Sequence, residues 1–485
     1  MIAATTVLIT GATVLLTYFA VTSIYRRRRK GEPLIATEHL IWGSAAAFSQ
    51  NAVAFLLRCA KKYGDVFTLR LVNQYLTIIM DPHSYEVVGK EKNFDFDPIQ
   101  KQVNLNVFNF VLKEPRKMIK DTGRTVRGAQ LNKAMSVFVE NLDQACDAEV
   151  PSQPAKQEWT QLGLRQMCAH TIFDALFYSI FGRREHPMFN PRRVYKNFEE
   201  FHRYFNYFWL GFPKKMFPSA MKALGELICQ PTSNELLSSD DVSDYIRTAT
   251  EYMKEQGQTE ADIMGHNLVY LHVNYNTFRL SFWLLYFLLK DPEAYRALSA
   301  EVQQAVDDKL NESTNTATFT PKDIEQMKIL DSVVTESSRL SSGVFMVRYI
   351  KEDTWFSTAQ GNKYLMRKGD RVAIYPPAIH KDPEIFEEPL KYKYDRFVDA
   401  KFYKYGQEVK NPVMAFGTLC PGKRYALLQA RWFLLKLLTQ YEIELLPGES
   451  TELDVEYHGH EILPPTNDVQ IKMRPRLDAP QLEFH

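Results

Sequence analysis

The hydrophobic pattern changes along the chain from short strand-like runs to long helical stretches. Two apolar runs, residues 66–71 and 75–80, flank Asn73-Gln74 and are rich in β-branched and aromatic side chains, so they predict a β-hairpin. From about Gln130 to Lys290 the apolar positions recur with helical spacing, with a break at Asn190-Pro191. The pattern predicts a mostly α-helical protein with small sheets.

The second half of the chain continues this alternation. Residues 264–289 are apolar nearly all round, which predicts a helix in the middle of a large core. Residues 311–320 predict a solvated loop, and a helix is expected from Pro321 to about Leu340. Short strands and turns fill residues 344–389, and a last helix is expected from Pro421 to Tyr441. With no internal repeat, one large helical domain with small peripheral β-sheets is expected.

The N-terminus has the pattern of a membrane anchor. Residues 2–25 contain no charged side chain, and a basic block, Arg26 to Lys30, follows at once. Twenty-four residues at about 1.5 Å each would form roughly 36 Å of helix, enough for a hydrocarbon core of about 30 Å. A cleaved signal peptide is the alternative, but its positive charges would precede the apolar run. We therefore predict a transmembrane helix with its basic stop over residues 1–30 and one large folded domain over 31–485.

The basic block also predicts the orientation of the anchor. Positive residues beside a membrane span stay on the cytoplasmic side, so the chain after Lys30 is expected in the cytosol. The region from Gly31 to about Gly43 is expected to be a linker that lets the body lie against the membrane.

Composition and charge narrow the classes of function. The 485 residues are 45% hydrophobic and carry a formal net charge of +1, which disfavours nucleic acid as a partner. The five cysteines are odd in number and have no Cys-x-x-Cys spacing, which favours a reducing compartment over a disulfide framework. Four of them, Cys59, Cys146, Cys168 and Cys229, are interpreted as small buried hydrophobic residues.

Cys420 differs from the other cysteines in its position. It precedes Pro421-Gly422 at the start of the last predicted helix. The positive end of a helix dipole lowers the pKa of a nearby thiol and favours the thiolate, which is a metal ligand. By itself this position is also typical of a buried or capping cysteine, so the function depends on what accompanies it.

Two charged residues on another predicted helix, one that faces the core, are the next candidates. Glu336 and Arg339 are three residues apart and therefore share one face of the helix predicted over 321–340. A lone buried charge costs several kcal/mol, so the pair needs partners inside the protein. Arg396 is one candidate, and an ordinary solvated pair on a helix surface is the alternative.

These features together resemble the cytochrome P450 family. A Glu-x-x-Arg pair (Glu336, Arg339), an Arg-Phe segment containing Arg396, and Phe416-Gly417 followed by Cys420-Pro421-Gly422 stand in the family's order. The resemblance implies the cytochrome P450 fold and haem b as cofactor, with Cys420 as the ligand of the iron. The cofactor-binding residues that it implies are Cys420, Arg348, Phe416, Glu336, Arg339 and Arg396.

The resemblance also assigns individual roles. Arg348 corresponds to a position that pairs with a haem propionate, which suits a bidentate guanidinium. Asn276 and Thr277 stand where the family's acid–alcohol pair lies over the haem, and they are the catalytic candidates that would hold water for proton delivery. An ordinary helix-packing pair is the alternative for these two residues.

A narrower resemblance is to the sterol branch of the family, which contains sterol 7α- and 12α-hydroxylases and prostacyclin synthase. It is carried by Arg367-Lys368-Gly369-Asp370, Asp382-Pro383-Glu384-Ile385 and the tail from Ile462 to Asp468. It implies a sterol or oxysterol hydroxylase of the 7α type in the endoplasmic reticulum membrane, served by NADPH-cytochrome P450 reductase. The alternatives are an isomerase of a lipid endoperoxide and a haem-deficient, non-catalytic relative.

The chain departs from the family pattern in three ways, and the first of them motivates the haem-deficient alternative. Phe416 and Cys420 are four positions apart where the family has seven, which removes about 10 Å of extended chain. Tyr275 would narrow the haem pocket if it faced the haem, and Arg279 stands where the sterol branch has proline. His272, on the same helix, is a weak ligand candidate and more typical of a core or surface histidine. The third departure is that no Trp-x-x-x-Arg stands between Arg116 and Lys133, where many members contact a propionate, and Arg124 and Arg127 are weaker candidates for that contact.

Overall fold

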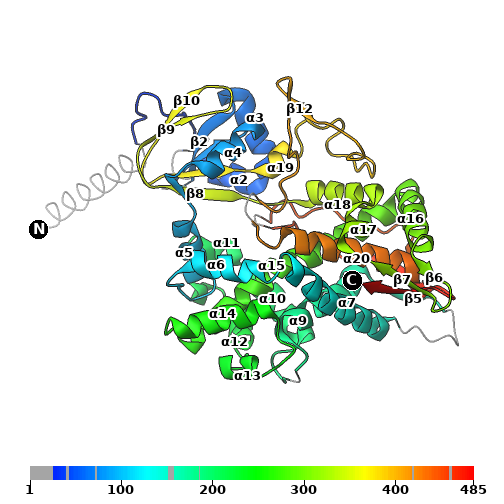
Figure 1. The fold of residues 1–485 in the computed structure, drawn as a ribbon. Helices are drawn as coiled ribbons and strands as arrows, with labels where there is room; N and C mark the ends of the chain where they lie inside the picture. Colours follow the sequence, from blue (N-terminus) through cyan, green and yellow to red (C-terminus); the bar gives the residue numbers. More distant parts are fainter. Residues whose placement is uncertain are drawn as a thin grey trace, which may run out of the picture.

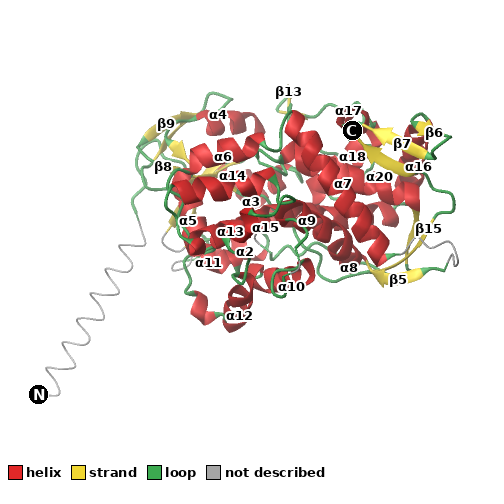
Figure 2. Cartoon of the chain, turned by 60° about the horizontal axis from the view of Figure 1, so that its bottom comes forward, coloured by secondary structure: helices red, strands yellow, loops and turns green. Residues whose placement is uncertain are grey.

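The structure is a computed structural model that describes residues 26–39, 43–71, 74–150, 158–184, 186–417, 420–457 and 461–485. Helices make up most of the body, and the strands gather at its two ends (Figure 2). One end carries β8 (Met346–Ile350) and β9 (Thr354–Ser357), and the other carries β5 (Thr160–Gly163) and β15 (Gln470–Pro475). The predicted mostly helical architecture with small sheets is confirmed.

The largest sheet has six strands and contains the predicted hairpin. Its order is β1-β2-β3-β11-β8-β4. In the hairpin Val66 lies opposite Ile79 and Leu71 opposite Gln74. The remaining strands of this sheet are β1 (Leu34–Ala36), β2 (Val66–Leu71), β3 (Gln74–Ile79), β4 (Phe94–Asp95) and β11 (Arg371–Ile374).

Four smaller sheets lie around the helices. They pair β9 with β10, β12 with β13, β14 with β15 and β5, and β16 with β7 and β6. Their strands not yet given are β6 (Leu310–Asn311), β7 (Thr316–Phe319), β10 (Lys363–Met366), β12 (Tyr403–Lys404), β13 (Gln407–Glu408), β14 (Tyr441–Leu445) and β16 (Gln481–Phe484). The hairpin β6–β7 occupies the segment predicted as a loop over 311–320, because β7 pairs with β16 from the far end of the chain.

The helices are arranged around one long central helix, α15, as the apolar pattern predicted (Figure 1). They are α2 (Ala45–Gln50), α3 (Ala52–Tyr63), α4 (Tyr85–Lys90), α5 (Asp97–Asn106), α6 (Pro115–Arg124), α7 (Ala129–Glu149), α8 (Leu164–Cys168), α9 (Asp174–Phe181), α10 (Pro191–His202), α11 (Phe205–Trp209), α12 (Pro218–Leu227), α13 (Ser233–Leu237), α14 (Asp244–Glu255), α15 (Glu260–Lys290), α16 (Pro292–Asp307), α17 (Pro321–Glu325), α18 (Lys328–Ser341), α19 (Pro376–Ile379) and α20 (Lys423–Gln440).

Local signals explain where α15 begins and ends. Thr259 and Asp262 form a reciprocal capping box that satisfies backbone N–H groups at its N-terminus. Asp291 ends it and caps the next helix, where Pro292 takes the first position. Between these ends, the buried side of this 31-residue helix packs against α18 and α20 in the main hydrophobic core.

The helix predicted from Pro321 to Leu340 is two helices, α17 and α18. Met327 has extended backbone angles and separates them. The carboxylate of Glu301, on α16, accepts the backbone N–H groups of Ile329 and Leu330 at 2.9 and 2.8 Å. This contact satisfies donors at the start of α18 that a continuous helix would have used internally.

The basic block and the segment after it are both joined to the large sheet. Arg26 pairs with Asp370 at 2.5 Å, and its guanidinium lies 4.1 Å from the centroid of the Tyr75 ring. Leu34 to Ala36 form β1, which pairs in parallel with β2. The expected linker over residues 31–43 is therefore partly a strand of the sheet.

The predicted transmembrane helix over residues 2–25 lies outside the described residues. Within the described ranges, which begin at Arg26, no helix combines the length and the apolar character needed to cross a bilayer.

The cysteine prediction is right for three residues and wrong for one. Cys59, Cys146 and Cys168 are buried. Cys229 is exposed just after α12, where its thiol donates to the carbonyl of Gly225 at 3.3 Å. It follows the last turn of a surface helix, so no core residue covers it.

Candidate functional site

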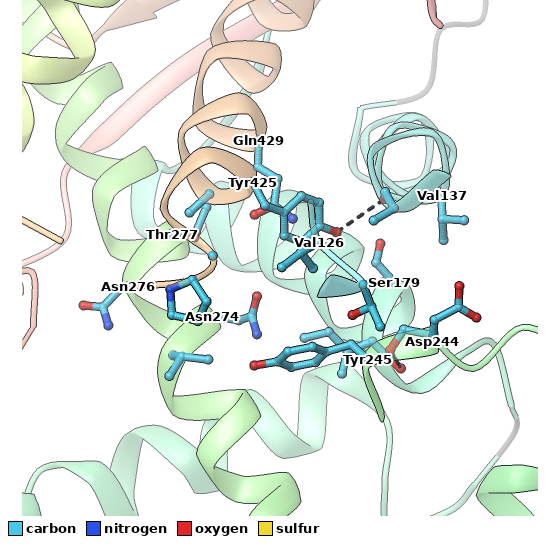
Figure 3. Close-up of a pocket in the computed structure, with 18 of the residues that line it drawn as sticks. Val126, Val137, Ser179, Asp244, Tyr245, Asn274, Asn276, Thr277, Tyr425 and Gln429 are labelled. Carbon is cyan, nitrogen blue, oxygen red and sulfur yellow. Dashed lines mark hydrogen bonds between the residues drawn. The ribbon is translucent and has the colours of Figure 1, made fainter. Parts of the chain in front are cut away.

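A cavity of about 610 Å³ lies among α7, α9, α14, α15 and α20. Figure 3 shows Tyr425 and Gln429 reaching toward it from α20, with Tyr245 on the opposite side. Its size is within the range of about 300–1,000 Å³ typical of small-molecule and cofactor sites. The residues that line it include Asn274, Asn276, Thr277, Phe416, Cys420, Gln429 and Ile462.

Cys420 lines this cavity and also borders a second pocket with Arg127 and Arg424. Burial by the surrounding protein raises the pKa of its thiol, whereas the backbone N–H groups of Gly422 and Lys423 and the charges of Lys423 and Arg127 oppose that rise. The start of the helix thus lowers the pKa of the thiol as expected, but the effect of burial is larger and the pKa is raised overall. Because a coordinating thiol is deprotonated by its metal, the N–H groups would support a thiolate ligand here.

Thr277 and Asn274 lie on the face of α15 that points toward Tyr425 (Figure 3). Asn276 lies on the other side, at the edge of the cavity, where its Oδ1 accepts the backbone N–H of Ile462 at 2.9 Å. This bond ties the C-terminal segment to the central helix. Of the two catalytic candidates, Thr277 is therefore the one whose side chain is directed at the cavity.

Tyr275 does not line the cavity. Its ring is buried against Phe173, Phe198 and Phe278, and its hydroxyl donates to Glu199 at 3.3 Å. The expected narrowing of the pocket by Tyr275 therefore does not occur, because the ring points to the neighbouring helices instead.

Phe416 lines the cavity from the shortened loop before Cys420. Gly417 follows with φ of 66°, a left-handed conformation that favours glycine. Residues 418 and 419 lie outside the described ranges. The loop thus brings both Phe416 and Cys420 to the same cavity in spite of its length.

Glu336, Arg339 and Arg396 form a charge cluster beneath this loop. Glu336 pairs with Arg339 Nε at 2.7 Å and with Arg396 Nε at 3.0 Å, and Glu336 and Arg339 have no exposed side-chain surface. Arg339 also donates to the carbonyls of His380 and Pro389 at 2.5 and 2.6 Å. These bonds hold the segment around residues 380–396 against α18. None of the three residues lines the cavity, so they would act on the loop and not on a ligand directly.

His380 connects the cluster to the loop. Its carbonyl receives Arg339, and its ring Nε2 accepts the backbone N–H of Met414 at 3.0 Å. A ring that accepts there is neutral, with its proton on Nδ1. Burial, aided by the charges of Arg339 and Lys381, lowers the pKa of His380 to about 3.

This pKa predicts a loss of stability in mild acid. The unfolded chain binds a proton at His380 near pH 6.5 but the folded chain only near pH 3, so stability falls as pH decreases between these values. Between pH 6.5 and pH 5 the free energy of unfolding, measured with urea, should fall by about 1.5 kcal/mol less in His380→Gln than in the wild type. The glutamine amide can still accept the N–H of Met414 but does not titrate. His485→Ala, at an exposed histidine, should leave the wild-type pH dependence unchanged. Equal slopes for wild type and His380→Gln would contradict the assignment.

Arg348 is placed away from the cavity. On β8 its guanidinium lies 4.8 Å from the centroid of the Phe96 ring and donates to the carbonyl of Val347. Arg127, a weaker candidate for contact with a propionate, donates to the carbonyl of Pro421 at 3.4 Å. The propionate-binding role of Arg348 remains a prediction that would need its side chain to turn.

Gln429 is a site residue that sequence reasoning missed. It is buried and lines the cavity, and neither polar atom of its amide has a hydrogen-bond partner among the described residues. Such unsatisfied groups are rare in folded proteins and often mark the place of a ligand or water. A single glutamine between the apolar residues 426–428 and Ala430 of the last helix was the available signal.

The cavity fits a haem by the chemistry of its donors. A cysteine sulfur with two backbone N–H groups beside it, an aromatic ring from the same loop and an unsatisfied buried amide face one space. Thiolate ligation with hydrogen bonds to the sulfur is one of the ways in which proteins hold haem iron and adjust its chemistry.

Comparison with known proteins agrees with this site. The model of the family described as cytochrome P450 matches residues 33–272 and 275–473. A 12α-hydroxylase of 7α-hydroxycholest-4-en-3-one from Oryctolagus cuniculus is 29% identical, over 95% of this chain and 97% of its own length. A cholesterol 7α-monooxygenase from Cricetulus griseus and a prostacyclin synthase from Rattus norvegicus are each 29% identical over 93% of this chain, covering 94% and 95% of their lengths. The chain therefore belongs to the cytochrome P450 family of haem-dependent oxidoreductases.

Proposed function

We propose that this protein is a haem-thiolate monooxygenase that hydroxylates a sterol or oxysterol. Its family and its hydroxylase relatives support the monooxygenase class. One observation carries the proposal: Cys420, from the loop before α20, and Thr277, from the central helix α15, line the same cavity. A ligand to the iron and a hydroxyl group for proton delivery would thus lie on two walls of the same space.

Cys420 would hold the haem iron, and Phe416 lines the same cavity. Arg348, which the family resemblance assigns to a propionate, lies outside the cavity over Phe96 and would have to turn to take that role. When bound, haem supplies the oxygen and electron-transfer chemistry, and its thiolate ligand favours oxygen–oxygen cleavage. The N–H groups of Gly422 and Lys423 stabilise the thiolate charge. Glu336, Arg339 and Arg396 keep the preceding segment in place, which fixes where the sulfur points.

Thr277 is proposed to hold a water molecule and pass protons through its Oγ1. It is buried on the cavity face of α15, so its hydroxyl is shielded from bulk solvent. Asn276 is proposed to assist by holding Ile462, which also lines the cavity. The helix and the C-terminal segment then form one rigid wall against which a substrate can be oriented.

The relatives support a sterol as substrate, since two of them are named for hydroxylation of cholesterol or a cholesterol derivative. We infer that electrons come from NADPH-cytochrome P450 reductase. We also infer that residues 1–30 anchor the protein in the endoplasmic reticulum membrane as a single span, with the catalytic domain in the cytosol. The apolar run and basic block support this arrangement.

The test is turnover by the purified full chain in lipid vesicles with the reductase and NADPH. Cholesterol and its 7α-hydroxylated and side-chain-oxidised derivatives serve as substrates, and products are identified by mass spectrometry. We expect a product that has gained one oxygen atom, formed only when the reductase and NADPH are present. Turnover of a lipid endoperoxide without reductase, with no sterol product, would favour the isomerase alternative.

A variant of Thr277 tests the proposed proton path in the same assay. We expect Thr277→Ala to lower product formed per NADPH consumed by roughly a hundredfold, as is typical when a positioned proton-transfer group is lost. Ser281→Ala is the matched control, because Ser281 lies one turn along α15, donates to the carbonyl of Thr277 and does not line the cavity. An unchanged ratio in Thr277→Ala would contradict the role of the hydroxyl.

A further inference from the structure

Two histidines and a glutamate converge at a second place, outside the cavity described above. His202 ends α10, His272 lies in the middle of α15, and Glu461 precedes Ile462 near the C-terminus. The side chains of His202 and Glu461 have no exposed surface, and that of His272 is 13% exposed. Three segments far apart in the sequence therefore bring three metal-ligand atoms into one buried place.

The three atoms are closer than ordinary packing requires. Glu461 Oε1 lies 2.5 Å from His202 Nε2 and 2.7 Å from His272 Nδ1, and the two nitrogens are 3.0 Å apart. Despite these approaches, Oε1 has no hydrogen-bond partner of suitable geometry among the described residues. His202 Nε2 and His272 Nδ1 are hydrogen-bonded to each other, and both lie beside Oε1, so the three atoms enclose a space that a cation could occupy in place of the shared proton.

The surroundings orient each of the three ligands. The hydroxyl of Tyr457 is hydrogen-bonded to His202 Nδ1, which leaves the lone pair of Nε2 for the cluster when Nδ1 carries the proton. The ring of Phe205 stacks on His202 at 5.2 Å and on His272 at 4.9 Å between centroids. Arg279 donates to Glu461 Oε2 at 2.7 Å and leaves Oε1 free to face the histidines.

We propose that His202, His272 and Glu461 form a binding site for one zinc ion. Two imidazole nitrogens and one carboxylate oxygen are a ligand set typical of zinc, whereas calcium and magnesium prefer oxygen ligands alone. Bonds of about 2.0–2.1 Å in tetrahedral geometry would separate the ligand atoms by about 3.3 Å. Each side chain therefore needs to move outward by only a fraction of an ångström, and the fourth position is left for water.

The site would join the C-terminal segment to two helices. Arg279 also donates to the carbonyl of Ile462, and Ile462 lines the haem cavity. A zinc ion at Glu461 would thus fix one wall of that cavity without taking part in the oxidation. Since the charges of Glu461 and Arg279 cancel, the site offers no net negative charge, and we expect weaker binding than at a site with an unpaired carboxylate.

The experiment measures zinc binding by the chelator-treated full chain, using calorimetry with zinc chloride and metal analysis after gel filtration. We expect one zinc per chain and an affinity at least tenfold weaker in His272→Gln, which changes the most exposed ligand. His485→Ala, at an exposed histidine, should bind zinc like the wild type. Circular dichroism verifies that each variant is folded, and Glu461→Gln is the second variant should His272→Gln fail to fold.

The wild-type protein alone gives an independent test. Cobalt in a tetrahedral site of this kind absorbs visible light, which is recorded as a difference spectrum against the cobalt-free protein so that any haem absorption cancels. One equivalent of zinc should remove this difference. Absence of stoichiometric zinc binding would overturn the proposal and leave a closed ion-pair network around Arg279. Equal zinc affinity in wild type and in the ligand variants would also overturn it, as adventitious binding. These measurements report metal binding and not haem content or turnover. A failure of the zinc proposal can therefore be distinguished from a failure of the proposed function.

Discussion

Replacing Cys420 with alanine is expected to abolish the strongly red-shifted Soret band of the reduced, carbon-monoxide-bound protein. That band reports thiolate ligation of haem iron, and Cys420 is the cysteine that lines the cavity between α15 and α20. Sterol turnover should fall by more than the roughly 10- to 100-fold loss that is typical when an outer-shell group of a metal site is changed. Absorbance spectroscopy and the turnover assay on purified protein measure both effects.

Cys229→Ala is the matched control for this variant. Cys229 is also exposed, but it lies just after α12 and not at the cavity, so its replacement should leave the spectrum unchanged. A folded wild-type protein without the red-shifted band, and no effect of Cys420→Ala, would reject haem-thiolate chemistry. The haem-deficient alternative, suggested by the four-residue step from Phe416 to Cys420, would then hold.

Replacing Arg339 with leucine is expected to lower the free energy of unfolding by about 3–5 kcal/mol, because it leaves buried charge and carbonyl groups without a partner. Glu336 would keep Arg396 and the backbone N–H of Lys393, and the carbonyls of His380 and Pro389 would lose their donor. The loosened segment adjoins Met414, so haem occupancy should fall as well. Urea unfolding at pH 7 measures the stability, and absorbance measures the haem content.

Two further variants separate charge from geometry at this cluster. Arg339→Lys keeps the positive charge but not the two parallel bonds to Glu336, so an intermediate loss is expected. Arg424→Ala removes an exposed arginine that pairs with Glu325, and it should cost less than about 1 kcal/mol. If Arg339→Leu lowers the free energy of unfolding no more than Arg424→Ala does, the buried cluster does not stabilise the fold.

Several features of the fold followed from local patterns. The β-branched and aromatic content of two apolar runs predicted the hairpin of β2 and β3, and the all-round apolar run predicted α15. The spacing of Glu336 and Arg339 predicted a pair on one helix face, and the structure has that pair at 2.7 Å. These predictions succeed because hydrogen bonding within a helix or hairpin links residues that are close in sequence.

Other features depended on contacts that no local pattern carries. The break between α17 and α18 depends on Glu301, which comes from another helix. Tyr275 faces an aromatic cluster of neighbouring helices and not the cavity, although its position on α15 was known. A helical residue can be assigned to a turn from sequence, but the neighbour that its face meets is chosen by tertiary packing.

The sequence by itself determined the helical class, the central helix, the shared helix face of Glu336 and Arg339 and the resemblance that singled out Cys420. Only the tertiary structure brought His202, His272 and Glu461 within 3.0 Å of one another and turned Arg348 onto Phe96. The physical reason is that periodicity and spacing report how a segment is buried and capped. Which distant side chains share a site is decided by how the completed helices and strands pack together.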